Sequence, residues 1–204
     1  MKRLLFIFLT LTLIIIFPLN CFAGLYYYGS GNYVSTAPVK PTGLKFYVDG
    51  TAITTYGSSA FSVIFDWNGS YKGHVTAVAQ YHDSAALYPD YFPINTTSMT
   101  IYSQGQTYFY KSNGSEITVS FPMDTTSIYK CKISLNSNKS AFNINGAYSS
   151  NYLKKVIRHE VGHVFLLKHP KDVNNNYIVY SVMNKGEPDS QYISATITTD
   201  DRNN

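Results

Sequence analysis

One short segment of this sequence, His159-Glu160-Val161-Gly162-His163, has residue types at a spacing that can bind a metal ion. In an α-helix, residues i and i+4 lie one turn apart on the same face, so the imidazoles of His159 and His163 can reach one ion. Glu160 follows the first histidine, which places its carboxylate beside a water molecule on that ion. The segment therefore predicts a catalytic zinc ion, with Glu160 as the general base that takes a proton from the zinc-bound water.

The same segment has a structural alternative, in which His159 and His163 lie at the surface and form salt bridges with Glu160. The sequence contains 5 His residues and only three Glu residues. Multiplying those frequencies through the pattern predicts a chance occurrence in roughly one such chain in a thousand. The metal-binding interpretation is therefore the hypothesis that the rest of the sequence has to support.

A third ligand is needed, because a catalytic zinc site normally has three protein ligands and keeps a fourth position for water. His169 lies six residues after His163 and is the leading choice. Asp172 is the substitute, since a carboxylate oxygen also binds zinc. We therefore predict a site made of two helical histidines and one ligand from the chain that follows the helix.

The spacing H-E-x-x-H-x-x-x-x-x-H resembles the zinc-binding motif of the metzincin metalloproteases. Residues 159–170 are similar to the matrixin branch of that clan, in its secreted bacterial form, and residues 180–184 are similar to the family's Met-turn. The resemblance is strong for the zinc-binding segment, covers residues 149–204, and is loose over the rest of the chain. Leu166 departs from it, because the family usually has a glycine there that ends the helix and turns the chain back.

The resemblance implies a zinc metalloendopeptidase and a role for each matching residue. One catalytic Zn²⁺ would be bound by His159, His163 and His169. Glu160 would be the general acid/base in peptide-bond hydrolysis, and Met183 would pack beneath the histidines without binding the metal. The implied α+β fold is a metzincin-like catalytic domain. It would have a twisted, mostly parallel five-stranded sheet, an early helix and a zinc-binding active-site helix.

The two histidines of the motif need a helix to bring them together, and the sequence predicts one over residues 151–165. No proline or turn cluster interrupts this stretch, and Ser149 or Ser150 can cap its start. Apolar residues recur on one side at helical spacing, which indicates that this face is buried. These residues are Ile157, Val161, Val164 and Phe165.

Upstream of this helix, short β-type segments alternate with Gly, Asn, Ser and Pro turns. An early helix is expected at 58–67, where β-branched residues leave a strand as the alternative. Strands followed by one strong helix are typical of an α+β domain or of a mixed sheet with helices on one face. The predicted strands are 45–48, 75–80, 98–102, 107–111, 116–121 and 129–135.

The first 23 residues have the pattern of an export signal. Lys2 and Arg3 precede an apolar run of 14 residues, 4–17, and the small residues Cys21 and Ala23 occupy the positions that signal peptidase reads. We therefore expect cleavage after Ala23 and secretion of the remaining chain. An uncleaved anchor has less support, because the run is about 21 Å long as a helix and a hydrocarbon core is about 30 Å thick.

Residues 24–204 fit one domain by size, the catalytic domain, in which 24–45 is an initial strand, a loop or a short pro-segment. Charged residues make up 14 % of the chain and hydrophobic residues 45 %, which argues against general disorder. The net charge of +4 includes Lys2 and Arg3, and the sequence has no basic run, so nucleic acid is not an expected partner. No later stretch is apolar enough to span a membrane, and we expect a monomer.

A protein or peptide substrate is the expected partner. The resemblance implies that the substrate lies extended along an edge strand above the zinc ion, and residues 116–121 are the candidate for this strand. Two other functions stay open, a secreted tyrosine-rich binding domain with a structural or vestigial zinc site and a narrow-specificity zinc amidase. The chain has 19 Tyr residues, which is the feature that a binding domain would use. Its scattered aspartates leave a calcium site undefined.

Overall fold

The structure is a computed structural model of the 204-residue chain. It describes residues 42–68, 74–80, 91–117, 128, 130–165, 167, 169, 181–183 and 196–198. The predicted export signal and most of the segment 24–45 lie outside the described residues. Among the helices that the structure does describe, none has the length and hydropathy needed to cross a membrane.

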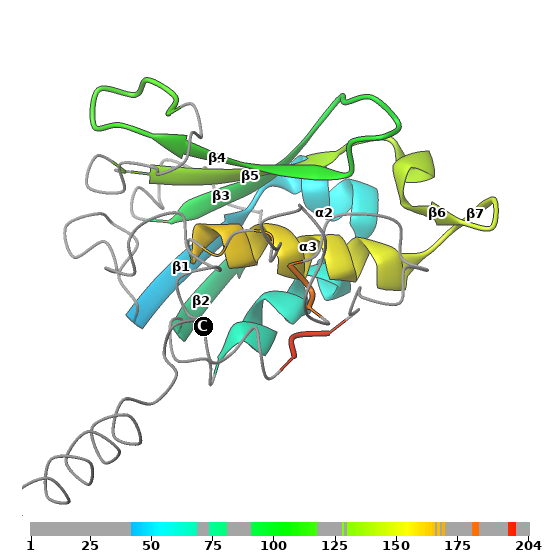
Figure 1. Cartoon of the computed structure of the whole chain (residues 1–204), viewed down its shortest axis with the longest axis horizontal. Coiled ribbons are helices and arrows are strands. Elements are labelled where there is room, and N and C mark those ends of the chain that lie inside the picture. Colours follow the sequence, from blue (N-terminus) through cyan, green and yellow to red (C-terminus); the bar gives the residue numbers. More distant parts are fainter. Residues whose placement is uncertain are drawn as a thin grey trace, which may run out of the picture.

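A mixed five-stranded sheet forms one layer of the fold, with the strand order β2-β1-β3-β5-β4 (Figure 1). Strand β1 pairs in parallel with β2 and β3, β3 pairs in parallel with β5, and β4 is antiparallel to β5. The strands are β1 (Thr42–Val48), β2 (His74–Gln80), β3 (Phe92–Thr97), β4 (Gly105–Tyr110) and β5 (Lys130–Asn136). This arrangement confirms the α+β class and the mostly parallel sheet.

The strands predicted at 45–48, 75–80, 107–111 and 129–135 overlap β1, β2, β4 and β5. The strand predicted at 98–102 is wrong, because that segment is a turn-containing connection with exposed apolar side chains. The strand that joins the sheet there is β3, in which Phe92 and Ile94 are buried on alternate positions. The sequence did not predict this strand, because Pro93 lacks the N–H that a central strand needs and so argues against one.

Four helical segments accompany the sheet in the described part of the chain, and the shortest is the 3₁₀ helix η5 (Lys139–Phe142). Helix α2 (Gly50–Tyr56) was not predicted, and its first turn is capped by Asp49, whose side chain accepts a hydrogen bond from the Thr51 N–H. The early helix expected at 58–67 occurs as the 3₁₀ helix η2 (Ser58–Trp67). Helix α3 (Ser150–Val164) begins after Ser149, whose hydroxyl caps it as the sequence predicts.

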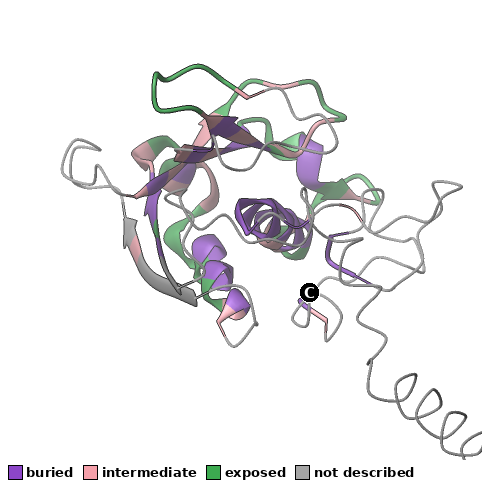
Figure 2. Ribbon diagram, turned by 60° about the vertical axis from the view of Figure 1, so that its left-hand side comes forward, coloured by how far each residue is buried: buried purple, intermediate pink, exposed green. Residues whose placement is uncertain are grey.

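Helix α3 lies against one face of the sheet and contacts β4, β5 and η2 (Figure 1). Figure 2 shows this helix near the middle of the molecule, buried along most of its length. Trp67 of η2 joins the two helices, since its indole N–H donates to the Arg158 carbonyl at 3.0 Å and its ring packs on Phe165. Arg158 in turn forms an ion pair with Asp66 at 2.7 Å. The helix that carries the motif is therefore held by the sheet and by η2.

Candidate metal centre

Helix α3 presents His159 and His163 on one face, one turn apart, as the motif requires. The helix ends at Val164, and the Leu167 N–H donates to the Gly162 carbonyl across the helix end at 3.1 Å. This bond turns the chain back toward the helix, so that His169 comes next to the two helical histidines. Leu166, the departure from the family pattern, lies outside the described residues.

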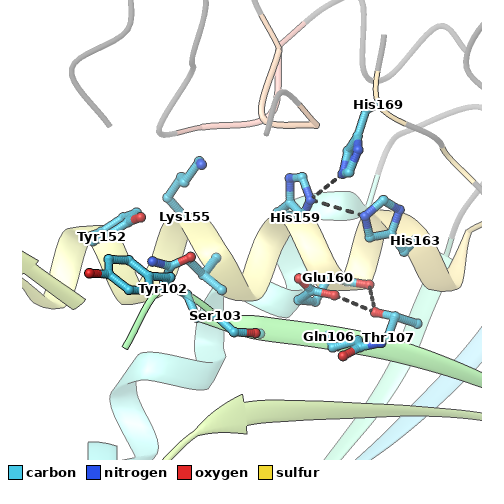
Figure 3. Close-up of a pocket in the computed structure, with 13 residues that line it drawn as sticks. Tyr102, Ser103, Gln106, Thr107, Tyr152, Lys155, His159, Glu160, His163 and His169 are labelled. Atoms are coloured by element: carbon cyan, nitrogen blue, oxygen red, sulfur yellow. Dashed lines mark hydrogen bonds between the residues drawn. The ribbon is translucent and has the colours of Figure 1, made fainter. Parts of the chain in front are cut away.

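The three histidines lie close enough together to bind one metal ion (Figure 3). The Nε2 atoms of His159 and His163 are 3.1 Å apart, and those of His159 and His169 are 3.0 Å apart. The structure therefore brings together the two helical histidines and the third candidate that the sequence indicates. Asp172, the substitute ligand, lies outside the described residues.

Backbone carbonyl groups orient both helical imidazoles. The Nδ1 atom of His159 lies 2.9 Å from the Val182 carbonyl oxygen, and Nδ1 of His163 lies 2.7 Å from the Leu167 carbonyl oxygen. A carbonyl oxygen only accepts, so each Nδ1 carries the hydrogen and donates it. In a neutral ring, Nε2 then presents a lone pair, and the two lone pairs face the same point. Hydrogen bonds of this kind are what fix the tautomer and direction of metal-binding histidines.

Burial keeps these rings neutral. It lowers the pKa of His163 to about 4, against a smaller opposing effect of the hydrogen bond to Leu167. Burial also lowers the pKa of His159 well below its usual value, and the charges of His163, His169 and Lys155 lower it further. Two neutral rings with lone pairs about 3 Å apart repel each other unless a cation lies between them. The donor set therefore fits a bound metal ion.

Met183 packs against helix α3 at Gly162, the residue that precedes His163. It is fully buried, and a β-carbon added to Gly162 would lie 2.2 Å from its sulfur atom. The Met183 N–H donates to the Ser181 hydroxyl at 2.8 Å, which stabilises a tight turn around Val182. The segment therefore supplies both the Val182 carbonyl that orients His159 and the side chain that packs against the helix at Gly162. Gly162 is required because any side chain there would occupy the space of the methionine.

Glu160 is buried with its carboxylate directed to β4 (Figure 3). The Thr107 hydroxyl lies 2.8 Å from Oε2 and 2.9 Å from the backbone oxygen of Glu160, so it can donate to either. Burial raises the pKa of Glu160 to about 7, and the Thr107 hydrogen bond and the positive charge of Lys155 act against this rise. A carboxyl group with this pKa can both accept and release a proton near neutral pH.

The histidines and Glu160 line a cavity of about 510 Å³ between α3 and the sheet. Strand β4 contributes Gly105 and Thr107 to its wall, and the connection before β4 contributes Tyr102. Of the segment 116–121, which was predicted as the edge strand, the structure describes Glu116 and Ile117, and neither residue lines the cavity. Glu116 forms a bridge with Tyr110, and the Ile117 N–H donates to the Phe109 carbonyl at 2.8 Å. Both residues therefore lie beside the second half of β4, whereas its first half lines the cavity.

Comparison of the chain with models of known protein families finds no matching family, and a search of curated proteins finds no match. The function of the site must therefore be inferred from its own chemistry. The structure combines three imidazole nitrogens that are close enough to bind one metal ion, a buried carboxyl group, and a cavity lined by all four residues.

Several residues of the site could not be predicted from the sequence, because no motif or spacing marks them. Thr107 and Gly105 belong to a strand with ordinary β-type residues, and Val182 acts through its backbone, which every residue has. Lys155 lies four residues before His159, at the spacing that places both on one helix face, and this spacing could have indicated it.

Proposed function

We propose that this protein is an exported zinc-dependent endopeptidase of the metzincin type. The observation that carries the proposal is the convergence of three imidazole nitrogens on the wall of a cavity that Glu160 also lines. Two of these nitrogens lie about 3 Å from Nε2 of His159, and all three lie within 4.8 Å of one another. Zinc fits this donor set, because nitrogen ligands at bond lengths of about 2.0–2.1 Å in a tetrahedral arrangement lie about 3.3 Å apart.

The openness of the site favours a catalytic role over a structural one. Structural zinc sites are closed by four protein ligands, whereas catalytic sites have three and keep a position for water or substrate. Among the described residues, the cluster contains three ligands, and all three line the cavity. This is the observation that counts against the alternative of a binding domain with a structural zinc ion.

Each residue of the site has a definite task in this proposal. His159, His163 and His169 hold the ion, and Val182 and Leu167 fix the first two rings. A zinc ion bound there supplies a Lewis acid and a water molecule of lowered pKa for attack on a peptide carbonyl group.

In this proposal Glu160 transfers the proton, and Thr107 orients the Glu160 carboxylate. Glu160 accepts a proton at its carboxylate and transfers it to the leaving amine, for which a pKa of about 7 is well suited. Thr107 donates a hydrogen bond to Oε2 and so keeps the carboxylate in one orientation. Gly105 allows the close approach of β4, because a β-carbon there would lie 3.0 Å from Cγ of Glu160.

The substrate is proposed to lie extended along β4. This strand is at the end of the sheet order, and its first half lines the cavity beside the metal-binding face. Within the described part of the chain, Gly105–Tyr108 pairs with β5 on one side and with no strand on the other. A peptide added along that side would receive main-chain hydrogen bonds and place its scissile bond near Glu160.

The test is cleavage of an unfolded protein by the purified secreted chain, with Glu160→Gln beside it. The wild type is expected to cleave, to lose activity with a zinc chelator and to recover it when zinc is added. Glu160→Gln keeps the size of the side chain and should bind one zinc ion per chain while losing about 10²–10⁴-fold in rate.

Two results would contradict the proposal. Equal cleavage by the wild type and Glu160→Gln would exclude Glu160 as the proton acceptor. Zinc binding without cleavage of any unfolded protein or peptide would exclude a general endopeptidase and favour the narrow amidase or the binding domain.

A further inference from the structure

The face of the sheet that is turned away from α3, here called the outer face, carries lysines beside tyrosines. Helix α3 contacts β4 on the face that carries Thr107, so the alternate residues Tyr108 and Tyr110 lie on the outer face. The strand pairing sets Lys132 of β5 opposite Tyr108 and Lys130 opposite Tyr110. The outer face of β4 and β5 therefore consists of two tyrosines paired with two lysines.

The ammonium groups on this face lie over the tyrosine rings. The Lys132 nitrogen is 4.9 Å from the centre of the Tyr108 ring and 5.7 Å from that of Tyr110. A second pair of this kind occurs where Lys45 of β1, which is exposed, lies 5.6 Å from the centre of the Tyr91 ring. Strand β3 lies between β1 and β5, so these two strands are about 10 Å apart. Cation–π contacts of this kind hold each ammonium group at the ring without neutralising its charge.

The charge on the outer face is positive and is not balanced by the strands themselves. Strands β1, β3, β4 and β5 contain three charged residues, and all three are these lysines. Between described residues the ion pair is Arg158–Asp66, so no described carboxylate pairs with them. Glu116, which bridges Tyr110 at the free side of β4, is exposed at the rim. The outer face is therefore complementary to an anion.

Aromatic rings beside well-separated cations suit a polysaccharide with acidic groups. A sugar ring has an apolar side that packs on a tyrosine ring, and its carboxylate or sulfate groups pair with ammonium groups. Gln106, also on the outer side of β4, is exposed and accepts a hydrogen bond from the Tyr108 hydroxyl at 3.2 Å, which adds polar groups for sugar hydroxyls.

Two other classes of polyanion fit the outer face less well. A nucleic acid carries a charge on every phosphate and needs a denser basic surface, whereas this chain has a net charge of +4 and no basic run. An anionic membrane surface would receive protruding apolar side chains, whereas Tyr108 and Tyr110 are half-buried.

We propose that the outer face of β1, β5 and β4 binds an anionic polysaccharide. This function does not depend on the proposed peptidase, because the outer face is on the opposite side of β4 from Thr107 and its contact with Glu160. The secreted chain would thereby attach to an acidic glycan while the metal centre stays accessible.

The test measures binding of the full secreted chain to fluorescent polymers by anisotropy. The two acidic polysaccharides are hyaluronan oligosaccharides, which carry carboxylates, and dextran sulfate, which carries sulfates. The controls are neutral dextran, polyglutamate, which has charge without sugar rings, and oligothymidylate. At least one acidic polysaccharide should bind tenfold or more tightly than all three controls, with an affinity that falls as salt is raised. The one that binds identifies the acidic group.

A matched pair of double variants separates the outer face from net charge. Lys130→Gln/Lys132→Gln should weaken binding of the acidic polysaccharide about five- to tenfold. Lys139→Gln/Lys154→Gln removes the same charge from η5 and α3 and should weaken it less than twofold. The control is close, since Lys139 also lies beside a tyrosine, 5.8 Å from the centre of the Tyr148 ring.

The role of the rings is tested with Tyr108→Leu and Tyr108→Phe. The leucine variant should bind the acidic polysaccharide several-fold more weakly, and the phenylalanine variant should retain most of the affinity, with thermal unfolding showing that both are folded. Three results would overturn the proposal: no binding of either acidic polysaccharide, equal binding of polyglutamate or oligothymidylate, or equal weakening by the two double variants. None of these measurements requires cleavage, so their outcome is separate from that of the proposed peptidase.

Discussion

Replacing Gly162 with alanine tests the packing of Met183 against the helix of the candidate metal centre. The substitution has two opposing effects on stability, and the size of each can be estimated. In the middle of a helix, alanine is favoured over glycine by about 0.8–1.0 kcal/mol. The added methyl group would lie 2.2 Å from the Met183 sulfur atom and 2.9 Å from a carbon atom of the Trp67 ring. Both neighbours are buried, so neither can move into solvent.

The steric effect should be the larger one. Contact distances between non-bonded atoms are about 3.5–4.0 Å, and forcing extra atoms into a packed core costs about 1–3 kcal/mol, or more at so short a distance. The short distance places the steric cost in the upper part of that range, about 2–3 kcal/mol. After subtraction of the helix preference, Gly162→Ala should lower the free energy of unfolding by about 1–2 kcal/mol. For a domain of this size that corresponds to a fall in Tm of about 2–8 °C.

The same substitution should weaken metal binding. Displacement of Met183 moves the adjacent Val182, whose carbonyl oxygen holds His159 at 2.9 Å. Loss of such an orienting contact typically reduces metal affinity by about 10- to 100-fold. Urea denaturation of the metal-free protein measures the first effect, and competition with a zinc-binding dye measures the second.

Met183→Ala provides the matched control. It leaves room for the methyl group of Gly162→Ala, so the double variant should be more stable than the sum of the two single effects predicts, by about 0.5–3 kcal/mol. The reasoning is refuted if Gly162→Ala raises stability by the amount that helix preference alone predicts, or if the two substitutions are additive.

Two further predictions concern β4 and β5. Thr107→Val removes the hydroxyl group that donates to Glu160, so kcat should fall about 10- to 100-fold with zinc content unchanged, and Thr107→Ser should restore it. An unchanged kcat in Thr107→Val would show that Glu160 needs no such donor. The Cys131 thiol is fully buried, and burial raises its pKa above its usual value, so iodoacetamide should label it only after unfolding. Peptide mapping measures the labelling, and rapid reaction of Cys131 in the folded protein would contradict the packing of β5.

The sequence by itself determined the helix that carries the two histidines and Glu160. Its predicted range of 151–165 differs by one residue at each end from α3, and the cap at Ser149 was among the two predicted. These features depend on residues within a few positions of one another, which is why capping and helical spacing are sufficient to predict them. The convergence of His169 with the motif could also be predicted, because the chain between them is short.

Strand prediction was less complete for a physical reason. The ladder of β3 forms between segments that are distant in the chain, such as Ile94 and Ile133, and neighbours in the sheet outweigh the local effect of Pro93. The segment 98–102 has suitable β-type residues but pairs with none of the strands that the structure describes, and it forms a connection.

Only the tertiary structure decided what surrounds the histidines and Glu160. Thr107 contacts Glu160 from 53 positions away, and Val182 holds His159 from 23 positions away through a backbone oxygen. Neither contact has a sequence pattern, because strand order and chain reversal create both. The type and spacing of residues thus determined which groups can do chemistry, while the packing of β4 and the Met183 turn against α3 decided how those groups are oriented, buried and charged.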